Sequence, residues 1–120
     1  MQNLPTISVI IPVYGVERYI THFAESLFSQ SYPHAQFVFV NDGSTDKTQE
    51  KLKEVYEMHS DKVQVLTFSR NFGKDAAIYA GLSYVKGDLV CIIDADLQQR
   101  PEVVLEMLRV MSEDENTDCV

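Results

Sequence analysis

Two aspartates and a glutamine follow an apolar run in the stretch VCIIDADLQ. In an extended backbone the side chains of Asp94, Asp96 and Gln98 point to one side, and those of Ala95 and Leu97 point to the other. Two carboxylates at this spacing repel each other, and a divalent cation relieves the repulsion. Their hard oxygen atoms suit Mg²⁺ or Mn²⁺, which keep further positions for water and substrate phosphates. The stretch can therefore form a metal site.

A structural interpretation of the same residues is also open. One aspartate can cap the helix that follows while the other is solvated. Two aspartates with one residue between them, considered without their position in the fold, favour this structural interpretation. The position of the pair in the fold decides between the two interpretations, so the surrounding elements have to be predicted first.

Short apolar runs alternate with segments of helical periodicity along the chain. The runs predict strands at 6–12, 36–41, 62–68 and 88–93. Helices are predicted at 17–31, from an N-cap at Thr45 or Asp46 to about His59, at 74–85 and from Pro101. Apolar strands that alternate with helices are typical of a parallel sheet covered on both faces. Because crossover connections are right-handed, we expect a Rossmann-like α/β sheet with strand order 3-2-1-4.

The loops after the predicted strands meet at one edge of such a sheet. They cover residues 12–17, 41–46, 69–75 and 94–98. Ligands bind at the carboxyl edge of parallel strands, close to the point where the strand order reverses. That point lies between the first and fourth strands, and the loops at 12–17 and 94–98 flank it. This position favours the metal site over the helix cap.

The other three loops each allow a functional and a structural interpretation. Asp42 can accept hydrogen bonds from a ribose or a base, or it can belong to a local turn. Tyr14 can stack on a base, or it can simply mark the exit of the first strand. Arg70 and Lys74 can balance the charge of a diphosphate, or they can lie in a solvated loop.

Composition and charge limit the classes of partner and compartment. The chain has 120 residues and a net charge of −8, which disfavours binding to nucleic acid. Two cysteines without CxxC spacing favour a reducing compartment. Neither a signal peptide nor an apolar run of about 20 residues is visible, so we expect a soluble, cytoplasmic chain. The last residues, TDCV, look like the start of a fifth strand, which indicates one part of a longer protein.

Four segments give a more specific signal: ISVIIPVYGVERYI, FVNDGSTDKT, RNFGKDAAIYAGL and DADLQQRPE. Together they resemble the amino-terminal half of a family 2 glycosyltransferase with the GT-A fold. The last two resemble the branch that moves sugars onto polyprenyl phosphates, such as dolichol-phosphate mannose synthases and bacterial undecaprenyl-phosphate glucosyltransferases. Residues 1–120 would then be the nucleotide-sugar-binding part of the domain, without its carboxy-terminal acceptor part.

The resemblance implies roles for individual loop residues toward a UDP- or GDP-sugar. Residues of the first loop would line the base pocket, Asp42 would meet the base or ribose, and the two later aspartates would lie at the ribose and the metal. The implied nucleotide-sugar contacts are Pro12, Val13, Tyr14, Glu17, Asp42, Arg70, Lys74, Asp94, Ala95 and Asp96, and the implied ligands of Mg²⁺ or Mn²⁺ are Asp94, Asp96 and Gln98.

The resemblance also implies metal-dependent, inverting transfer of a sugar. The acceptor would be a polyprenyl phosphate, or else a polysaccharide or other glycan. The general base would lie beyond Val120, so this chain alone is expected to be incomplete for turnover. Any association with the cytoplasmic face of a membrane would come through parts outside the chain.

Two other functions stay open, with less support. One is a sugar-phosphate nucleotidyltransferase, although PVYGVERY lacks the glycine-rich, basic loop that such enzymes usually place after the first strand. The other is a noncatalytic nucleotide-binding module. Both would use the same carboxyl edge of the sheet.

Overall fold

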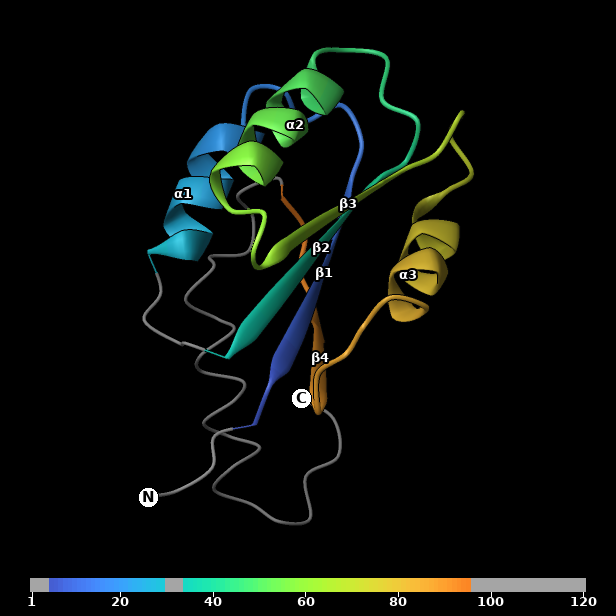
Figure 1. The fold of residues 1–120 in the computed structure, drawn as a ribbon. Coiled ribbons are helices and arrows are strands. Elements are labelled where there is room, and N and C mark those ends of the chain that lie inside the picture. The colour runs from blue at the N-terminus through green and yellow to red at the C-terminus, as the bar shows by residue number, and fades with distance from the viewer. Residues whose placement is uncertain (1–4, 30–33, 96–120) are drawn as a thin grey trace.

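The computed structural model describes residues 5–29 and 34–95, in which strands and helices alternate (Figure 1). The helix predicted from Pro101 lies outside these residues. The elements are β1 (Ile7–Val13), α1 (Ile20–Phe28), β2 (Ala35–Asn41), α2 (Thr48–Met58), β3 (Val63–Thr67), α3 (Lys74–Leu82) and β4 (Leu89–Ile92).

The strands form one parallel sheet in the order β3-β2-β1-β4, which confirms the predicted order. Figure 1 shows α1 and α2 together on one face of the sheet and α3 on the opposite face. The expected two-sided α/β architecture is therefore present in the described part of the chain.

The first helix begins later than predicted and the third helix ends earlier, whereas α3 begins at Lys74 as predicted. α1 begins at Ile20 instead of residue 17, because the carbonyl of Val16 first accepts the N–H of Tyr19, at 2.9 Å, in a turn. α3 ends at Leu82 instead of residue 85, and the N–H of Tyr84 donates to the carbonyl of Gly81 at 3.0 Å. Local turns thus take over where the periodicity alone predicted more helix.

Strand β1 is buried along its whole length because it has a strand on each side and helices on both faces. Val9 and Ile11 pack into the larger apolar cluster under α1 and α2, whereas Ile10 packs into the smaller cluster under α3. The alternation of these side chains is that of a central strand. It explains why the run ISVIIPV is apolar without interruption.

Each face is covered by a helix whose packing side fits the sheet. α1 buries Ile20, Phe23, Ala24 and Leu27, a spacing that forms one helical stripe. α3 approaches β1 more closely: a Cβ at Gly81 would lie 2.6 Å from Cγ2 of Ile10. This close packing holds the last turn of α3 against β1.

The register of the strands brings the carboxyl ends of β1, β2 and β3 to one level. Val13 pairs with Asn41, which pairs with Thr67 in turn. On the other side of β1, β4 ends earlier: its last residue, Ile92, pairs with Ile10, whose carbonyl accepts the N–H of Ile93 at 3.1 Å. The segments that follow the four strands therefore leave the sheet at the same edge.

Candidate nucleotide-sugar site

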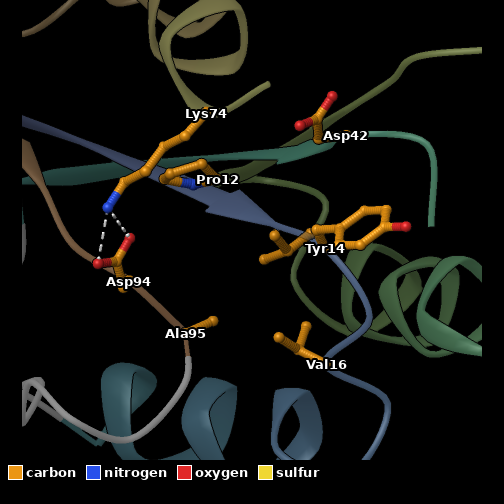
Figure 2. Close-up of a pocket in the computed structure, with 8 residues that line it drawn as sticks. Pro12, Tyr14, Val16, Asp42, Lys74, Asp94 and Ala95 are labelled. Carbon is orange, nitrogen blue, oxygen red and sulfur yellow. Dashed lines mark hydrogen bonds and ion pairs between the residues drawn. The ribbon is translucent and has the colours of Figure 1, made fainter. Parts of the chain in front are cut away.

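A pocket of about 260 Å³ lies at the carboxyl edge, where β1 and β4 diverge from each other. Figure 2 shows side chains that reach it from several loops. The lining residues are Pro12, Val13, Tyr14, Val16, Asp42, Lys74, Asp94 and Ala95. The pocket thus lies at the predicted reversal point of the strand order.

One side of the pocket holds an ion pair between the start of α3 and the end of β4. Nζ of Lys74 lies 2.9 Å from each carboxylate oxygen of Asp94, as the dashed lines in Figure 2 show. The side chains are 57% and 33% exposed. An ion pair this accessible contributes little to stability, so both groups remain available to a ligand.

The opposite end of the pocket is formed by the exit of β1. Tyr14 is half exposed, at 53% of its residue surface, whereas Val13 and Val16 are buried. Ala95 is also buried, as the alternation after β4 predicted. A half-exposed aromatic ring beside buried aliphatic groups is a surface on which a flat apolar group can stack.

Asp42 lies on the pocket wall, but its carboxylate is already engaged. The side chain is buried, with a 4% exposed residue surface, and its oxygens accept hydrogen bonds from the loop before α3. Oδ1 accepts the N–H of Phe72 at 2.7 Å, and Oδ2 accepts the N–H of Gly73 at 3.0 Å. From the sequence, Asp42 was expected either to contact a ribose or base or to belong to a local turn. Neither expectation includes hydrogen bonds to the loop before α3.

Gly43 allows the same two loops to touch. Its φ is +70°, and a Cβ at this position would overlap the backbone of Arg70 and Asn71. A positive φ is a conformation that glycine adopts without strain. The close approach of the second backbone is an additional reason that the sequence did not reveal.

The loop after β1 is held by the same segment in a different way. Three consecutive backbone N–H groups donate to three side chains that follow β2. The pairs are Gly15 with Ser44 Oγ at 3.0 Å, Val16 with Thr48 Oγ1 at 3.0 Å, and Glu17 with Asp46 Oδ2 at 3.5 Å. The segment Asp42–Thr48 therefore holds both neighbouring loops.

Asp46 also supports the start of α2. Its Oδ1 accepts the N–H of Thr48 at 3.0 Å and the hydroxyl of Thr48. The helix is preceded by Lys47 at the N-cap position, so neither predicted residue, Thr45 or Asp46, occupies it. Burial alone would raise the pKa of Asp46, but the hydrogen bonds from Thr48 and from the N–H of Glu17 outweigh it and hold that pKa below its ordinary value.

Two of the residues implied by the resemblance do not line the pocket. Glu17 contributes its backbone, with its carbonyl accepting a hydrogen bond from Lys51 Nζ at 2.6 Å. The guanidinium of Arg70 lies over the ring of Phe72, 4.7 Å from its centroid, on an exposed part of the loop.

Asp96 and Gln98, two of the implied metal ligands, lie outside residues 5–29 and 34–95. Within those ranges, no group of three or more His, Cys, Asp or Glu side chains is placed to hold a metal. Asp94 is the implied ligand that the structure describes, and its partly exposed carboxylate offers the hard oxygen atoms that Mg²⁺ or Mn²⁺ prefers.

Comparison with known proteins identifies the family to which this fold and pocket belong. The sequence model described as glycosyl transferase family 2 matches residues 8–120. The chain belongs to this family. Among curated proteins, it is 38% identical over 105 residues to the bactoprenol glucosyl transferase of Shigella phage SfV, a match that covers 85% of the chain and 34% of that protein.

Solved structures of glycosyltransferases have the same fold over nearly the whole chain. A mannosyltransferase from Pyrobaculum calidifontis, in complex with GDP-Man and Mn²⁺, superposes with a TM-score of 0.81 at 26% identity, over 90% of this chain and 32% of that one. TarS 1–349 from S. aureus, in complex with UDP-GlcNAc, superposes with a TM-score of 0.75 at 28% identity, over 92% and 32% of the two chains.

The family 2 chain described here is short beside its relatives. It spans about a third of the length of the curated relatives that it matches. None of the helices in the described residues is long and apolar enough to span a membrane.

Proposed function

We propose that the pocket between β1 and β4 binds the nucleoside diphosphate of a UDP- or GDP-sugar for transfer of the sugar to an acceptor. The observation that carries the proposal is the accessible pair of Lys74 and Asp94 at the reversal point of the sheet. This family 2 chain is acidic overall, but at the pocket it places the ammonium group of Lys74 beside the carboxylate of Asp94. The ammonium group suits phosphate oxygens, and the carboxylate suits a divalent metal.

The proposed cation site consists of Asp94, Asp96 and Gln98. When bound, Mg²⁺ or Mn²⁺ would neutralise the charge that grows on the diphosphate as the bond to the sugar breaks. The presence of Mn²⁺ in the related mannosyltransferase complex supports this choice of metals. The carboxylate of Asp94 fits the group because its oxygens are hard ligands and reach the pocket.

The chain's own groups would orient the donor. Tyr14, with Pro12 and Val13 beside it, would contact the base, and Lys74 would lie against the diphosphate at the other end of the pocket. Ala95 would close the wall between them. Arg70 would add positive charge from outside the pocket, and Glu17 would act through its backbone in the loop after β1.

The acceptor that we propose is a polyprenyl phosphate. The support is the 38% identity with a protein named as a bactoprenol glucosyl transferase, because bactoprenol is a polyprenyl lipid. Transfer with inversion would need only an in-line attack by the phosphate oxygen, which is already a nucleophile. Residues 1–120 would be the donor-binding part, and the remaining groups would come from sequence beyond Val120.

Calorimetric titration of the chain with UDP and with GDP, each with and without Mn²⁺, tests the proposed donor site. We expect weak binding of one of the two nucleotides, which requires Mn²⁺ and is lost in Asp96→Ala. A matched control is Asp61→Ala, an exposed aspartate that precedes β3 at the amino edge of the sheet. Binding that is unchanged in Asp96→Ala would contradict the metal role, and no binding of either nucleotide would contradict the donor site.

A further inference from the structure

We propose that Lys74 and a divalent cation exchange at the carboxylate of Asp94, so that binding of the cation releases the lysine to the diphosphate. The inference rests on the proposed function, which assigns a diphosphate and Mg²⁺ or Mn²⁺ to the pocket between β1 and β4. It adds a coupling between the two ligands, because one lysine side chain opposes the cation when the diphosphate is absent and binds the diphosphate when it is present.

The first observation is that the lysine engages the whole carboxylate. Nζ of Lys74 lies 2.9 Å from each of the two oxygens of Asp94, and Figure 2 shows both contacts. The ammonium group therefore faces both oxygens at once and balances their charge. A divalent cation needs the same oxygens as ligands, and its charge would repel the ammonium group at so short a range. The two cations therefore compete for Asp94.

The second observation is that the lysine side chain can move while its helix stays in place. Lys74 is the first residue of α3, and its side chain is 57% exposed. Ala77, in the same turn of the helix, is fully buried in the apolar cluster that contains Ile10. An ion pair this accessible is weak, and the flexible four-carbon stem of a lysine allows its ammonium group to turn between neighbouring partners. Exchange therefore needs no movement of the backbone.

The third observation is that both members of the ion pair line the pocket proposed for the donor. A diphosphate in this pocket offers Lys74 phosphate oxygens in place of the carboxylate. Each positive charge then has an anionic partner, because the divalent cation takes Asp94 and the lysine takes the diphosphate. Without the diphosphate, the divalent cation would displace Lys74 and give it no phosphate in return. The two ligands should therefore bind cooperatively, each raising the affinity for the other.

Substitution Lys74→Met separates the exchange from two simpler roles, because the three roles predict different signs. A lysine that only contacts the diphosphate would leave the affinity for the divalent cation alone unchanged when it is removed. A lysine that only orients the Asp94 carboxylate for the cation would, on removal, weaken binding of the cation. The exchange predicts instead that the cation alone binds more tightly to Lys74→Met, because its competitor is gone.

Electron paramagnetic resonance of free Mn²⁺ measures binding of the cation without any nucleotide. We expect Lys74→Met to bind Mn²⁺ about two- to fivefold more tightly than the wild type, which corresponds to the loss of an exposed ion pair. Lys74→Arg keeps the competing charge and should stay near the wild type. The matched control for net charge is Lys53→Met at an exposed position of α2, which should also stay near the wild type. An Mn²⁺ affinity of Lys74→Met no higher than that of Lys53→Met would overturn the exchange.

Calorimetry with UDP and with GDP at saturating Mn²⁺ completes the test. For the nucleotide that the chain prefers, Lys74→Met should bind the diphosphate about tenfold more weakly, although it binds Mn²⁺ alone more tightly. A weaker diphosphate with an unchanged affinity for Mn²⁺ would overturn the exchange and leave the proposed function in place. Tighter Mn²⁺ binding by Lys74→Met, in a chain whose wild type binds neither nucleotide, would instead contradict the proposed donor site and leave the competition at Asp94 in place.

Discussion

The loop after β1 and the loop before α3 are both held by the segment Asp42–Thr48, but by different means. The first loop gives one N–H to each of three side chains. The second gives two N–H groups to one carboxylate, that of Asp42. The N–H groups beside Tyr14 are thus divided among three acceptor residues, whereas the two N–H groups before Lys74 share one carboxylate.

This difference predicts how each loop responds to substitution. The first loop has acceptors on three residues, so the effect of removing one acceptor should be graded. A substitution of Asp42 weakens both of its hydrogen bonds to the second loop at once, and a side chain at Gly43 would displace the same backbone. Hydrogen bonds to a charged group also contribute about 1.5–3 kcal/mol, against about 0.5–1.5 kcal/mol for neutral pairs.

The largest expected effect is that of Gly43→Ala. A side chain at φ +70° is strained, and its Cβ would overlap the backbone of Arg70 and Asn71. Together these should lower the free energy of unfolding by about 3 kcal/mol. Urea denaturation followed by circular dichroism measures it.

Gly15→Ala in the other loop is the matched control. Its φ is +61°, and a Cβ there would meet Asp46 Oδ2 at 3.8 Å, an ordinary contact. The backbone strain is the same but the overlap is absent, so we expect the free energy of unfolding to fall by only about 1–2 kcal/mol. If Gly43→Ala and Gly15→Ala lowered the free energy of unfolding equally, the close backbone contact at Gly43 would not contribute to the effect.

A smaller effect is expected from Thr48→Val in the first loop. Thr48 is fully buried, and its hydroxyl accepts the N–H of Val16 and donates to Asp46. The valine keeps the shape but leaves the N–H of Val16 without its acceptor and Asp46 without this donor. We expect the free energy of unfolding to fall by about 1–2 kcal/mol. Ser44→Ala, which exposes the N–H of Gly15 to water, should cost less than about 0.5 kcal/mol, and a reversed order would contradict the argument from burial.

The smallest expected effect is the pH dependence that comes from Asp46. Because hydrogen bonds lower its pKa in the folded chain, the carboxylate stabilises the fold above the ordinary value of 3.8. This contribution disappears as the pH falls from 3.8 through the lower folded pKa. Asp46→Asn should therefore flatten the acid side of the stability curve, measured by thermal unfolding at several pH values. Parallel curves for the two proteins would contradict the lowered pKa.

Periodicity and chain direction were sufficient to predict the sheet order and the edge at which the site lies. An uninterrupted apolar strand such as β1 is central, and right-handed crossovers then leave few arrangements. The same reasoning correctly brought Lys74 and Asp94 to one edge, although they are 20 residues apart. It did not predict that they pair.

The roles of Asp42 and Thr48 could not be predicted in the same way. Their partners are backbone N–H groups, which every residue except proline has, so no residue type marks them. The N–H of Phe72 is 30 positions from Asp42, and its direction depends on the fold of the whole loop. In contrast, Glu17 and Arg70 have suggestive side chains but do not line the pocket.

We propose that the two loops contact opposite ends of one ligand. Calorimetry with Mn²⁺ can measure the ratio of diphosphate to nucleoside affinity in Lys74→Met and in Thr48→Val. We expect Lys74→Met to lower this ratio about tenfold, because the lysine meets only the diphosphate, and we expect Thr48→Val, which disturbs the loop beside Tyr14, to weaken both ligands alike. The same change of ratio in both variants would contradict the division of the pocket between the two loops.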